Sequence, residues 1–451
     1  MEGENAFLYK FKEIDIMNDQ PNKSSKKSKI IIIILSCIIV VLIIIIILLI
    51  VLKDYNSQKN INKEKDNDSD QESEKKSEDK KEENPQEKSS EDIINFLRKT
   101  FCGDIYYNLP YAEETIKNTF KLNGDNYREE IGEINGNENY KGNSFFNKYD
   151  LYIPYSALKT KKTKGIILFI HGGAWIQGSK EEMSNLCQIY FEHEYIIANM
   201  DYTLLNENKK ITIYRQLDEI SACIENIKYR LKDVGFDENE MQVAVGGGSA
   251  GGHLALLYGY LLKVHPLPIK FIMEAIGPVN LETDDFYMIE KDEDTLPDIE
   301  PETVNKALQK NKYNKTLLAD DFIVKLLNLF IGNQYNEEDL KGMLKDNKID
   351  KKNEKYIELF EKAKYGFPLN WMEGKNIPIL ALYGGKDPLV GFVQYARLKE
   401  TAIKNGNTIQ IVYSRYGGHE FSEFVHPEGI IAAKDFHFYM LKFCEEYFNK
   451  Y

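Results

Sequence analysis

From about residue 93 onward, the sequence predicts an α/β fold built on a doubly wound, mostly parallel sheet. Strand-like and helix-like stretches alternate along this part of the chain, which is typical of βαβ units. Several strand-like stretches, such as Gly165 to Ile170, are apolar without interruption. A strand that is buried on both faces of a parallel sheet has this composition, whereas a half-exposed strand alternates apolar and polar residues.

Seven strands and five helices are expected from these stretches. The predicted strands cover residues 150–153, 165–170, 195–202, 241–245, 269–276, 377–383 and 408–413. The predicted helices cover residues 180–193, 211–232, 252–264, 392–404 and 427–448. The alternation stops at about 282–370, which is acidic at first and then contains helix-like pieces at 322–330 and 354–364. We expect a helical cap inserted over the carboxyl edge of the sheet, with a floppy surface insertion as the alternative.

The first 92 residues differ from the rest of the chain. Residues 30–52 are 23 consecutive uncharged residues, nearly all Ile, Leu or Val, and as a helix of roughly 34 Å they could cross a bilayer core of ~30 Å. They predict a single transmembrane helix. Lysines cluster just before it, so the positive-inside rule places the tail, residues 1–29, in the cytosol and the remainder outside or in a lumen. Residues 53–92 are highly charged, which predicts a disordered linker before the folded domain at 93–451.

Charge and cysteine usage exclude some classes of function. The net charge of −13 over 451 residues argues against a nucleic-acid-binding surface. Cys37 lies in the predicted membrane helix, and the other four cysteines could pair in three ways if the folded domain is extracytoplasmic. No C-x-x-C or Cys/His cluster occurs, so we expect no structural metal.

The stretch Gly247–Gly251 has the sequence Gly-Gly-Ser-Ala-Gly and joins a predicted strand to a predicted helix. A serine at the tip of so sharp a turn has a strained backbone, and neighbouring side chains would clash with the start of the helix and with a substrate. G-x-S-x-G in this setting is typical of a nucleophile elbow, with Ser249 as the nucleophile.

A second glycine-rich turn, His171–Trp175, directly follows the strand that ends at residue 170. Acyl transfer needs backbone N–H donors aimed at the developing oxyanion, and a turn of small residues lets a carbonyl group approach them. We expect the oxyanion hole to consist of Gly173, Ala174 and Ala250, with Gly172 shaping the turn. His171 is expected to be structural, and Trp175 either forms a wall of the substrate pocket or simply packs in the core.

A catalytic serine needs a histidine base and an acid that holds the histidine, in the chain order Ser, Asp or Glu, His. Asp387 and His419 each lie just past a predicted strand, where open α/β sheets place their active sites. We therefore predict a triad of Ser249, Asp387 and His419. The rival acids are Glu420 and Asp435, and the rival bases are His426 and His437.

Together, His171-Gly172-Gly173, the run from Gly247 to His253, Gly385 to Pro388, and Gly418-His419 resemble the hormone-sensitive-lipase-like and feruloyl-esterase-like esterase/lipase branch of the α/β-hydrolases. The resemblance covers residues 145 to 450. It implies a Ser-Asp-His carboxylic ester hydrolase that uses no metal or organic cofactor. Kynurenine formamidases and prenylcysteine methylesterases share a similar His-Gly-Gly-x-Trp loop. The chain departs from the common His-Gly-Gly-Gly loop at Ala174, and its cap is longer than the resemblance implies.

The expected function is that of a membrane-anchored serine hydrolase acting on a small-molecule ester. Two alternatives come from other classes. One is a serine amidase or peptidase, for example a formamidase-like enzyme, and the other is a non-catalytic binding module built on a hydrolase fold. Retention of all three triad residues and of the oxyanion loop favours an enzyme over a binding module.

Overall fold

The computed structural model describes residues 103–111, 147–206, 211–282, 286–288, 314–315, 320–419 and 427–448. The chain divides into two units at residues 86 and 87, and all described residues belong to the second unit. The predicted tail, membrane helix and linker lie outside the described residues. Among the helices that are described, none is long and apolar enough to cross a membrane.

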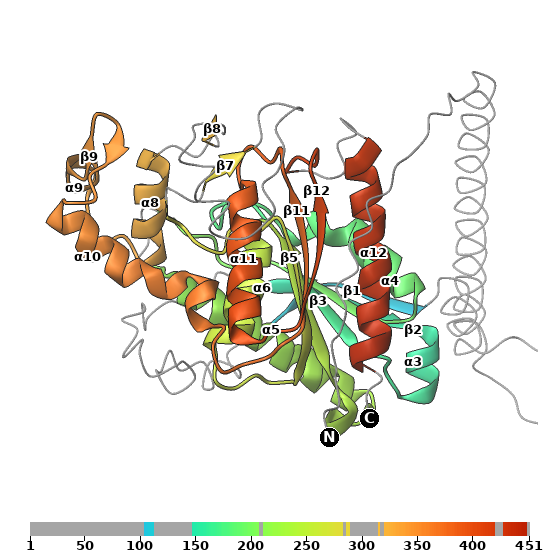
Figure 1. Ribbon diagram of the computed structural model, residues 1–451. Helices are drawn as coiled ribbons and strands as arrows, with labels where there is room; N and C mark the ends of the chain where they lie inside the picture. The colour runs from blue at the N-terminus through green and yellow to red at the C-terminus, as the bar shows by residue number, and fades with distance from the viewer. Residues whose placement is uncertain are drawn as a thin grey trace, which may run out of the picture. The chain divides into compact units, whose positions relative to one another are not determined.

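An eight-stranded sheet forms the centre of this unit (Figure 1). Its strands stand in the order β1-β2-β4-β3-β5-β6-β11-β12. They are β1 (Gly103–Pro110), β2 (Lys148–Pro154), β3 (Ile166–Ile170), β4 (Ile196–Met200), β5 (Val243–Gly248), β6 (Ile269–Ala275), β11 (Ile379–Gly384) and β12 (Ile409–Ser414). Strand β2 pairs antiparallel with both β1 and β4, and the remaining pairs are parallel.

All seven predicted strands are present, with ends that differ by a few residues. Strand β1 was not predicted, because it lies at the edge of the sheet and lacks a continuous apolar run. Its Tyr106 and Tyr107 are exposed, and it ends in Pro110, a residue that sheets tolerate at strand edges and ends.

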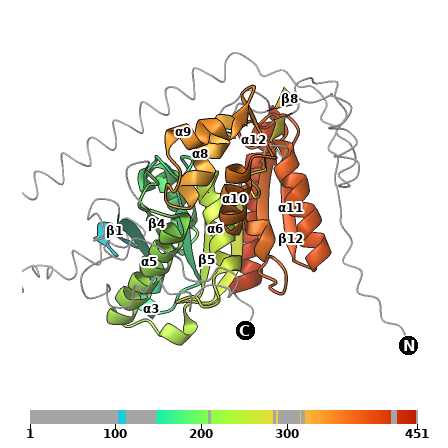
Figure 2. The same ribbon diagram turned by 90° about the vertical axis from the view of Figure 1, so that its left-hand side faces the viewer.

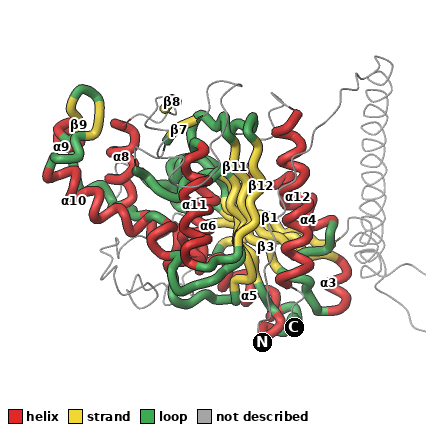
Figure 3. Tube along the Cα trace, viewed as in Figure 1, coloured by secondary structure: helices red, strands yellow, loops and turns green. Residues whose placement is uncertain are grey.

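Helices cover both faces of the sheet, which confirms the doubly wound architecture (Figures 1 and 3). One face carries α5 (Ile213–Asp233), α6 (Ala250–Leu261) and α11 (Phe392–Asn405). The opposite face carries α4 (Ser184–Glu192) and α12 (Pro427–Phe448). The short helix α3 (Tyr155–Thr160) contributes Ala157 to the hydrophobic cluster of the α5 face. Strand β3 shows why its sequence is apolar throughout: Ile166, Leu168 and Ile170 join the hydrophobic cluster on the α5 face, whereas Ile167 and Phe169 join the cluster on the α4 face.

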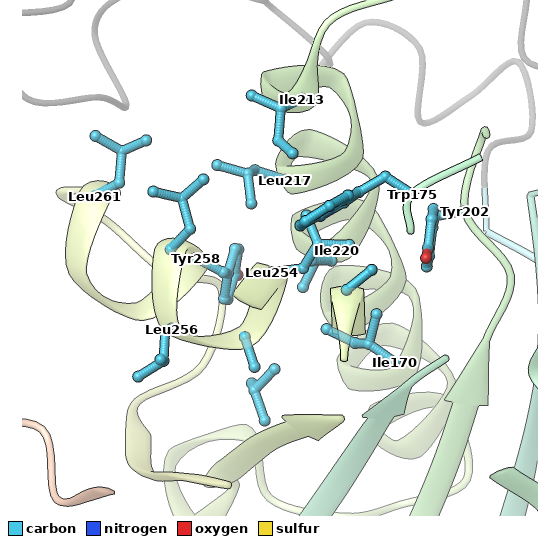
Figure 4. Packing of buried hydrophobic residues seen from close by; sticks show 14 of the residues in the cluster. Ile170, Trp175, Tyr202, Ile213, Leu217, Ile220, Leu254, Leu256, Tyr258 and Leu261 are labelled. Atoms are coloured by element: carbon cyan, nitrogen blue, oxygen red, sulfur yellow. The ribbon is translucent and has the colours of Figure 1, made fainter. Parts of the chain in front are cut away.

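The helix predicted from residue 180 begins as a 3-10 turn, η3 (Lys180–Met183), and continues as α4. Side chains of α5 and α6 interdigitate above the sheet (Figure 4). Leu217 and Ile220 of α5 face Leu254 and Tyr258 of α6, and all four are fully buried. Every residue of α6 is buried, so this helix has no polar face.

The cap lies between β6 and β11 in the chain, and its helices pack beside α5 and α6 (Figure 2). Its described elements are β7 (Tyr287–Met288), β8 (Asn314–Lys315), α8 (Asp320–Phe330), α9 (Glu337–Gly342), β9 (Leu344–Lys345), β10 (Lys348–Ile349), α10 (Glu354–Ala363), η6 (Lys364–Gly366) and η7 (Pro368–Trp371). Helix α8 buries Ile323, Val324 and Leu327 in the same hydrophobic cluster as α5 and α6. The described part of the cap therefore shares one core with the sheet.

Three cysteines are described, and all three are buried free thiols: Cys187, Cys223 and Cys444. Cys187 belongs to the cluster between the sheet and α4, whereas Cys223 belongs to the cluster on the α5 face. The sheet therefore separates these two thiols, although their helices are close in sequence. Cys37 and Cys102 lie outside the described residues.

Candidate active site

Ser249 occupies the sharp turn between β5 and α6. Its φ of 54° and ψ of −121° form a conformation that few non-glycine residues adopt. Hydrogen bonds on both sides hold the turn: the N–H of Ser249 donates to the Ala275 carbonyl at 2.8 Å, and the Ser249 carbonyl accepts from the His253 N–H at 3.1 Å. The predicted elbow is therefore the turn that the structure shows.

The glycines on either side of the serine are required by the end of strand β3. A Cβ atom on Gly247 would lie 2.2 Å from the Ile170 carbonyl oxygen, and a Cβ atom on Gly251 would lie 2.1 Å from the same oxygen. Both distances are far below van der Waals contact. A Cβ atom on Gly248, by contrast, would meet only the Ala275 carbonyl oxygen at 3.8 Å. Strand β5 can therefore turn into α6 beside β3 only where Gly247 and Gly251 lack side chains.

The structure brings the three predicted triad residues together. His419 Nε2 lies 3.1 Å from Ser249 Oγ, and His419 Nδ1 lies 2.8 Å from Asp387 Oδ2. Asp387 is fully buried, whereas the His419 side chain is 17% exposed. The histidine thus reaches solvent beside the serine while the carboxyl group does not.

Two loops, after β11 and β12, place Asp387 and His419 against each other. Asp387 Oδ1 accepts hydrogen bonds from the backbone N–H groups of Leu389 and Val390, each at 2.8 Å. The Lys386 N–H donates to the Gly417 carbonyl at 3.0 Å, which links the two loops directly. The other carboxylate oxygen, Asp387 Oδ2, is the one that lies against His419 Nδ1.

The rival residues lie elsewhere or outside the described part of the chain. Asp435 is exposed on α12, and His437 on the same helix lies 2.7 Å from the Tyr190 hydroxyl. Glu420 and His426 lie outside the described residues.

The predicted oxyanion loop has three consecutive residues with positive φ: Gly173 at 96°, Ala174 at 49° and Trp175 at 64°. Backbone N–H groups that follow one another through such a turn can converge into an anion-binding concavity. Ala250 is the first residue of α6, so its N–H has no partner within the helix and lies at the positive end of the helix dipole. Gly172 lies against the elbow: a Cβ atom added to this glycine would lie 3.4 Å from the Cβ atom of Ser249.

His171 supports this loop from below and is not placed as a base. Its ring stacks on Tyr202 with 4.1 Å between the centroids, and its Nδ1 lies 2.8 Å from the Gly172 carbonyl oxygen. Burial lowers the pKa of His171 to about 4, so the ring is neutral at pH 7. The Tyr202 hydroxyl donates to the Gly172 carbonyl at 3.1 Å, which fixes the start of the loop.

Trp175 connects the oxyanion loop to α6 and to the cap. The indole is 3% exposed and packs edge-on against His253 and Phe330, each at 4.9 Å between centroids. Figure 4 shows it among the side chains between α5 and α6. These contacts describe a packed core residue, and a role in the substrate pocket stays a prediction.

His253 was not singled out from the sequence, although it ends the glycine-rich run. Its Nδ1 lies 3.2 Å from Trp175 Nε1, and its Nε2 lies 2.8 Å from the Gly366 carbonyl oxygen in the cap. An indole N–H can only donate, so His253 Nδ1 accepts and Nε2 carries the proton given to Gly366. Burial lowers the pKa of His253 to about 3, and the neutral ring bridges three segments.

No group of three or more His, Cys, Asp or Glu side chains that could hold a metal ion is found within the described ranges. The chemistry that this arrangement supports is nucleophilic attack by an activated serine on a carbonyl carbon.

Comparison with known proteins places the chain among esterases. The family model described as BD-FAE matches residues 149–402, which is more than half of the chain. The probable isoprenylcysteine alpha-carbonyl methylesterase ICME of Oryza sativa subsp. japonica is 29% identical over 184 residues, covering 36% of this chain and 42% of that protein. The isoprenylcysteine alpha-carbonyl methylesterase ICME of Arabidopsis thaliana is 31% identical over 109 residues, covering 24% of each. The chain thus aligns with less than half the length of these relatives.

Two solved structures that align with much of this chain are named as esterases. A truncated carbohydrate esterase from gut microbiota has a TM-score of 0.48 at 15% identity, covering 78% of this chain and 98% of that one. Esterase B from Lactobacillus rhamnosis has a TM-score of 0.46 at 14% identity, covering 78% and 91%. Because the family match runs from β2 into α11, the protein belongs to the BD-FAE family, a feruloyl-esterase-like branch of the α/β-hydrolases.

Proposed function

We propose that this protein is a serine hydrolase that cleaves carboxylic esters, with Ser249 as nucleophile, His419 as base and Asp387 as the acid that orients the base. The observation that carries the proposal is the pair of distances at His419, 3.1 Å to Ser249 Oγ and 2.8 Å to Asp387 Oδ2. Both lie within the reach expected for a nucleophile, its base and the residue that orients the base.

In the proposed mechanism, His419 Nε2 takes the proton of Ser249 as Oγ attacks the ester carbonyl carbon. Asp387 keeps the Nδ1 proton in place, so Nε2 is free to accept, and it stabilises the imidazolium that forms. The tetrahedral oxyanion is stabilised by the backbone N–H groups of Gly173, Ala174 and Ala250. The alcohol leaves with the proton held by His419, and a water molecule deprotonated by His419 then hydrolyses the acyl-enzyme.

The proposed substrate is a small-molecule ester. Support comes from the BD-FAE family match and from curated relatives named as methylesterases of isoprenylcysteine. Methyl esters of prenylated cysteine therefore belong in a substrate panel beside simple acyl esters. A serine amidase or peptidase uses the same triad, so turnover of matched ester and amide substrates distinguishes the two activities.

We also propose that residues 30–52 anchor the protein in a membrane, with the N-terminus in the cytosol and the hydrolase domain outside or in a lumen. The support is the length of the uncharged run and the lysines that precede it. Residues 53–92 would then serve as a charged spacer between the membrane and the domain.

The test of the catalytic proposal compares the full-length protein with its Ser249→Ala variant in detergent micelles, on p-nitrophenyl esters from acetate to palmitate. We expect the variant to lose at least about a thousandfold in kcat, because the other triad members cannot act without the nucleophile. The control is Ser221→Ala on α5, which removes only a hydroxyl that donates to Tyr258 at 3.3 Å.

Ester turnover that persists in Ser249→Ala, with Ser221→Ala unchanged, would contradict the assignment of the nucleophile. A folded wild-type protein that cleaves amides and no ester would favour the amidase. One that cleaves neither would favour a binding module.

A further inference from the structure

Glu274 is a fully buried carboxyl group directly behind the elbow, and the proposed mechanism does not use it. It lies near the end of β6, paired in register with Gly247 of β5 and Ala381 of β11. Its side chain points toward α6, because a Cβ atom on Gly252 would lie 3.2 Å from Glu274 Oε1. The carboxyl group of Glu274 therefore lies beneath the first turn of α6, the helix that follows Ser249.

Glu274 and Tyr383 meet at Gly277, just after the end of β6. The Gly277 N–H donates to Glu274 Oε1, and the Gly277 carbonyl accepts from the Tyr383 hydroxyl at 2.7 Å. Tyr383 is fully buried on β11, and its hydroxyl also interacts with the Glu274 carboxyl group. The ends of β6 and β11 are thus tied together behind the nucleophile.

Counting protons in this arrangement favours the acid form of Glu274. A tyrosine hydroxyl has one proton to donate, and that of Tyr383 is given to Gly277. That proton is therefore not available to a Glu274 carboxylate. In addition, Glu274 Oε2 has no hydrogen-bond partner within the described residues, and leaving a charged oxygen so buried is expensive.

The electrostatic surroundings agree with this count. In the described part of the chain no cation contributes to the surroundings of Glu274, and burial raises the pKa of its carboxyl group to about 8. The other titratable groups nearby are His253 on α6, Tyr383 on β11 and Asp387 beyond β11. The pKa of His253 is lowered to about 3 and that of Tyr383 is raised well above its usual value. Both side chains are therefore neutral near pH 7, and the histidine supplies no positive charge to Glu274.

We infer that Glu274 is held as a neutral carboxylic acid and that, with Tyr383, it positions the Ser249 elbow relative to the Asp387 loop. The geometry for this role is direct. The carbonyl of Ala275, the residue after Glu274, accepts a hydrogen bond from the Ser249 N–H at 2.8 Å. The N–H of the next residue, Ile276, donates to the Leu382 carbonyl at 2.7 Å. Tyr383 lies four residues before Asp387 on the same chain segment. Glu274 is a positioning residue, and its role in the reaction rests on the proposed function.

Loss of the Glu274 proton would place a negative charge behind the elbow. That charge would oppose the developing oxyanion and weaken the fixed spacing between Ser249 and the Asp387 loop. We therefore expect activity to decline as the pH rises through about 8.

The first test uses stability, which does not depend on any catalytic role. A carboxyl group whose pKa is raised in the folded state stabilises the fold fully below its unfolded pKa of about 4.3, and this contribution is lost as the pH rises toward the folded value. We would measure the melting temperature of the full-length protein and of Glu274→Gln from pH 5 to 9. Glutamine keeps the shape of the side chain and can still accept from the Gly277 N–H, but it does not titrate.

The melting temperature of the wild type relative to Glu274→Gln should fall between pH 5 and 8 and level off above that. The matched control is Glu282→Gln, a charge removal at an exposed carboxyl group, which should show no such decline. A difference between the wild type and Glu274→Gln that stays constant from pH 5 to 8 would overturn the inference, because Glu274 would then be ionised throughout.

The second test measures ester hydrolysis against pH. Glu274→Leu should lower kcat at least about tenfold with KM within about twofold, since displacing the nucleophile affects the chemical step. Glu274→Gln should restore most of kcat and should lack the alkaline decline of the wild type. An alkaline decline that is the same in both proteins would overturn the positioning role. If the wild type has no ester turnover at all, the proposed function fails, while the stability test still decides the protonation state.

Discussion

At the scale of single residues, the site depends on backbone positions that exclude most side chains. Ser249 and Ala174 both adopt positive φ, at 54° and 49°. In the proposed mechanism, the first supplies the nucleophilic hydroxyl and the second a backbone N–H for the oxyanion. Gly247 and Gly251 permit the elbow by approaching one carbonyl oxygen, that of Ile170. The four residues occur in two short glycine-rich runs, because a strained turn needs small neighbours on both sides.

The residue scale gives a matched pair of substitutions within the elbow. Gly251→Ala would place a Cβ atom 2.1 Å from the Ile170 carbonyl oxygen and 2.7 Å from that of His171, so we expect it to lower the free energy of unfolding by about 3 kcal/mol or more. Gly248→Ala meets its nearest atom at 3.8 Å and should change stability by less than about 1 kcal/mol. Urea unfolding followed by circular dichroism compares them, and equal losses would contradict this account of the elbow.

At the scale of elements, the cap and the oxyanion loop share a core. The indole of Trp175, the imidazole of His253 and the ring of Phe330 form one buried group, and His253 also reaches the Gly366 carbonyl. The oxyanion loop, the elbow helix and the cap therefore meet in one set of contacts. A change in the packing of the cap should reach the loop that carries Ala174.

Trp175→Phe tests this connection, with Trp371→Phe as its control. Each substitution removes one hydrogen bond donated by an indole N–H. Trp175 donates to His253 Nδ1 at 3.2 Å, and Trp371 donates to the partly buried Tyr365 carbonyl at 2.8 Å. Each loss leaves an acceptor without its donor, at a cost of about 1–3 kcal/mol where the acceptor is buried. Both variants should therefore unfold at lower urea concentration. Only Trp175→Phe should also lower kcat for ester hydrolysis, because only Trp175 adjoins the proposed oxyanion donors. Similar kinetics in both variants would argue against coupling between cap and loop.

At the scale of the whole molecule, the folded unit is preceded by a segment of very different composition. The described residues of the second unit include an eight-stranded sheet with a hydrophobic cluster on each face. Residues 30–52 are uncharged and nearly all Ile, Leu or Val, and residues 53–92 have almost no apolar side chains. This division predicts that anchoring and catalysis are separable.

Deletion of residues 30–52 tests that separation. We expect the full-length protein to stay in the membrane pellet after carbonate extraction and the deletion variant to be released, because only a run of this length spans the bilayer. Protease added to the cytosolic side of sealed vesicles should leave the hydrolase domain intact. Release of the full-length chain by carbonate would contradict the anchor, and digestion of the domain would contradict its orientation.

Much of the fold was predictable because its signals are local. The apolar runs of β3 and β5 and the stretches that form α5 and α11 are each visible within a few residues, and the structure places them close to the expected bounds. Strand β1 was not predictable in this way, because an edge strand with exposed Tyr106 and Tyr107 has no continuous apolar run. The roles of Glu274 and His253 also escaped prediction, since their partners Tyr383 and Gly366 lie more than 100 positions away.

The sequence by itself determined which segments become strands and helices, which turns must be built from glycine, and which residue types are available for acyl transfer. These properties depend on hydrophobic periodicity and on steric limits between neighbouring residues. Only the tertiary structure decided that Ser249 and His419, 170 positions apart, lie 3.1 Å from each other. It also decided that Glu274 is buried with no counter-charge among the described residues. Such distances follow from the order of strands in the sheet, because parallel strands bring the loops at their carboxyl ends to one edge whatever their separation in the chain.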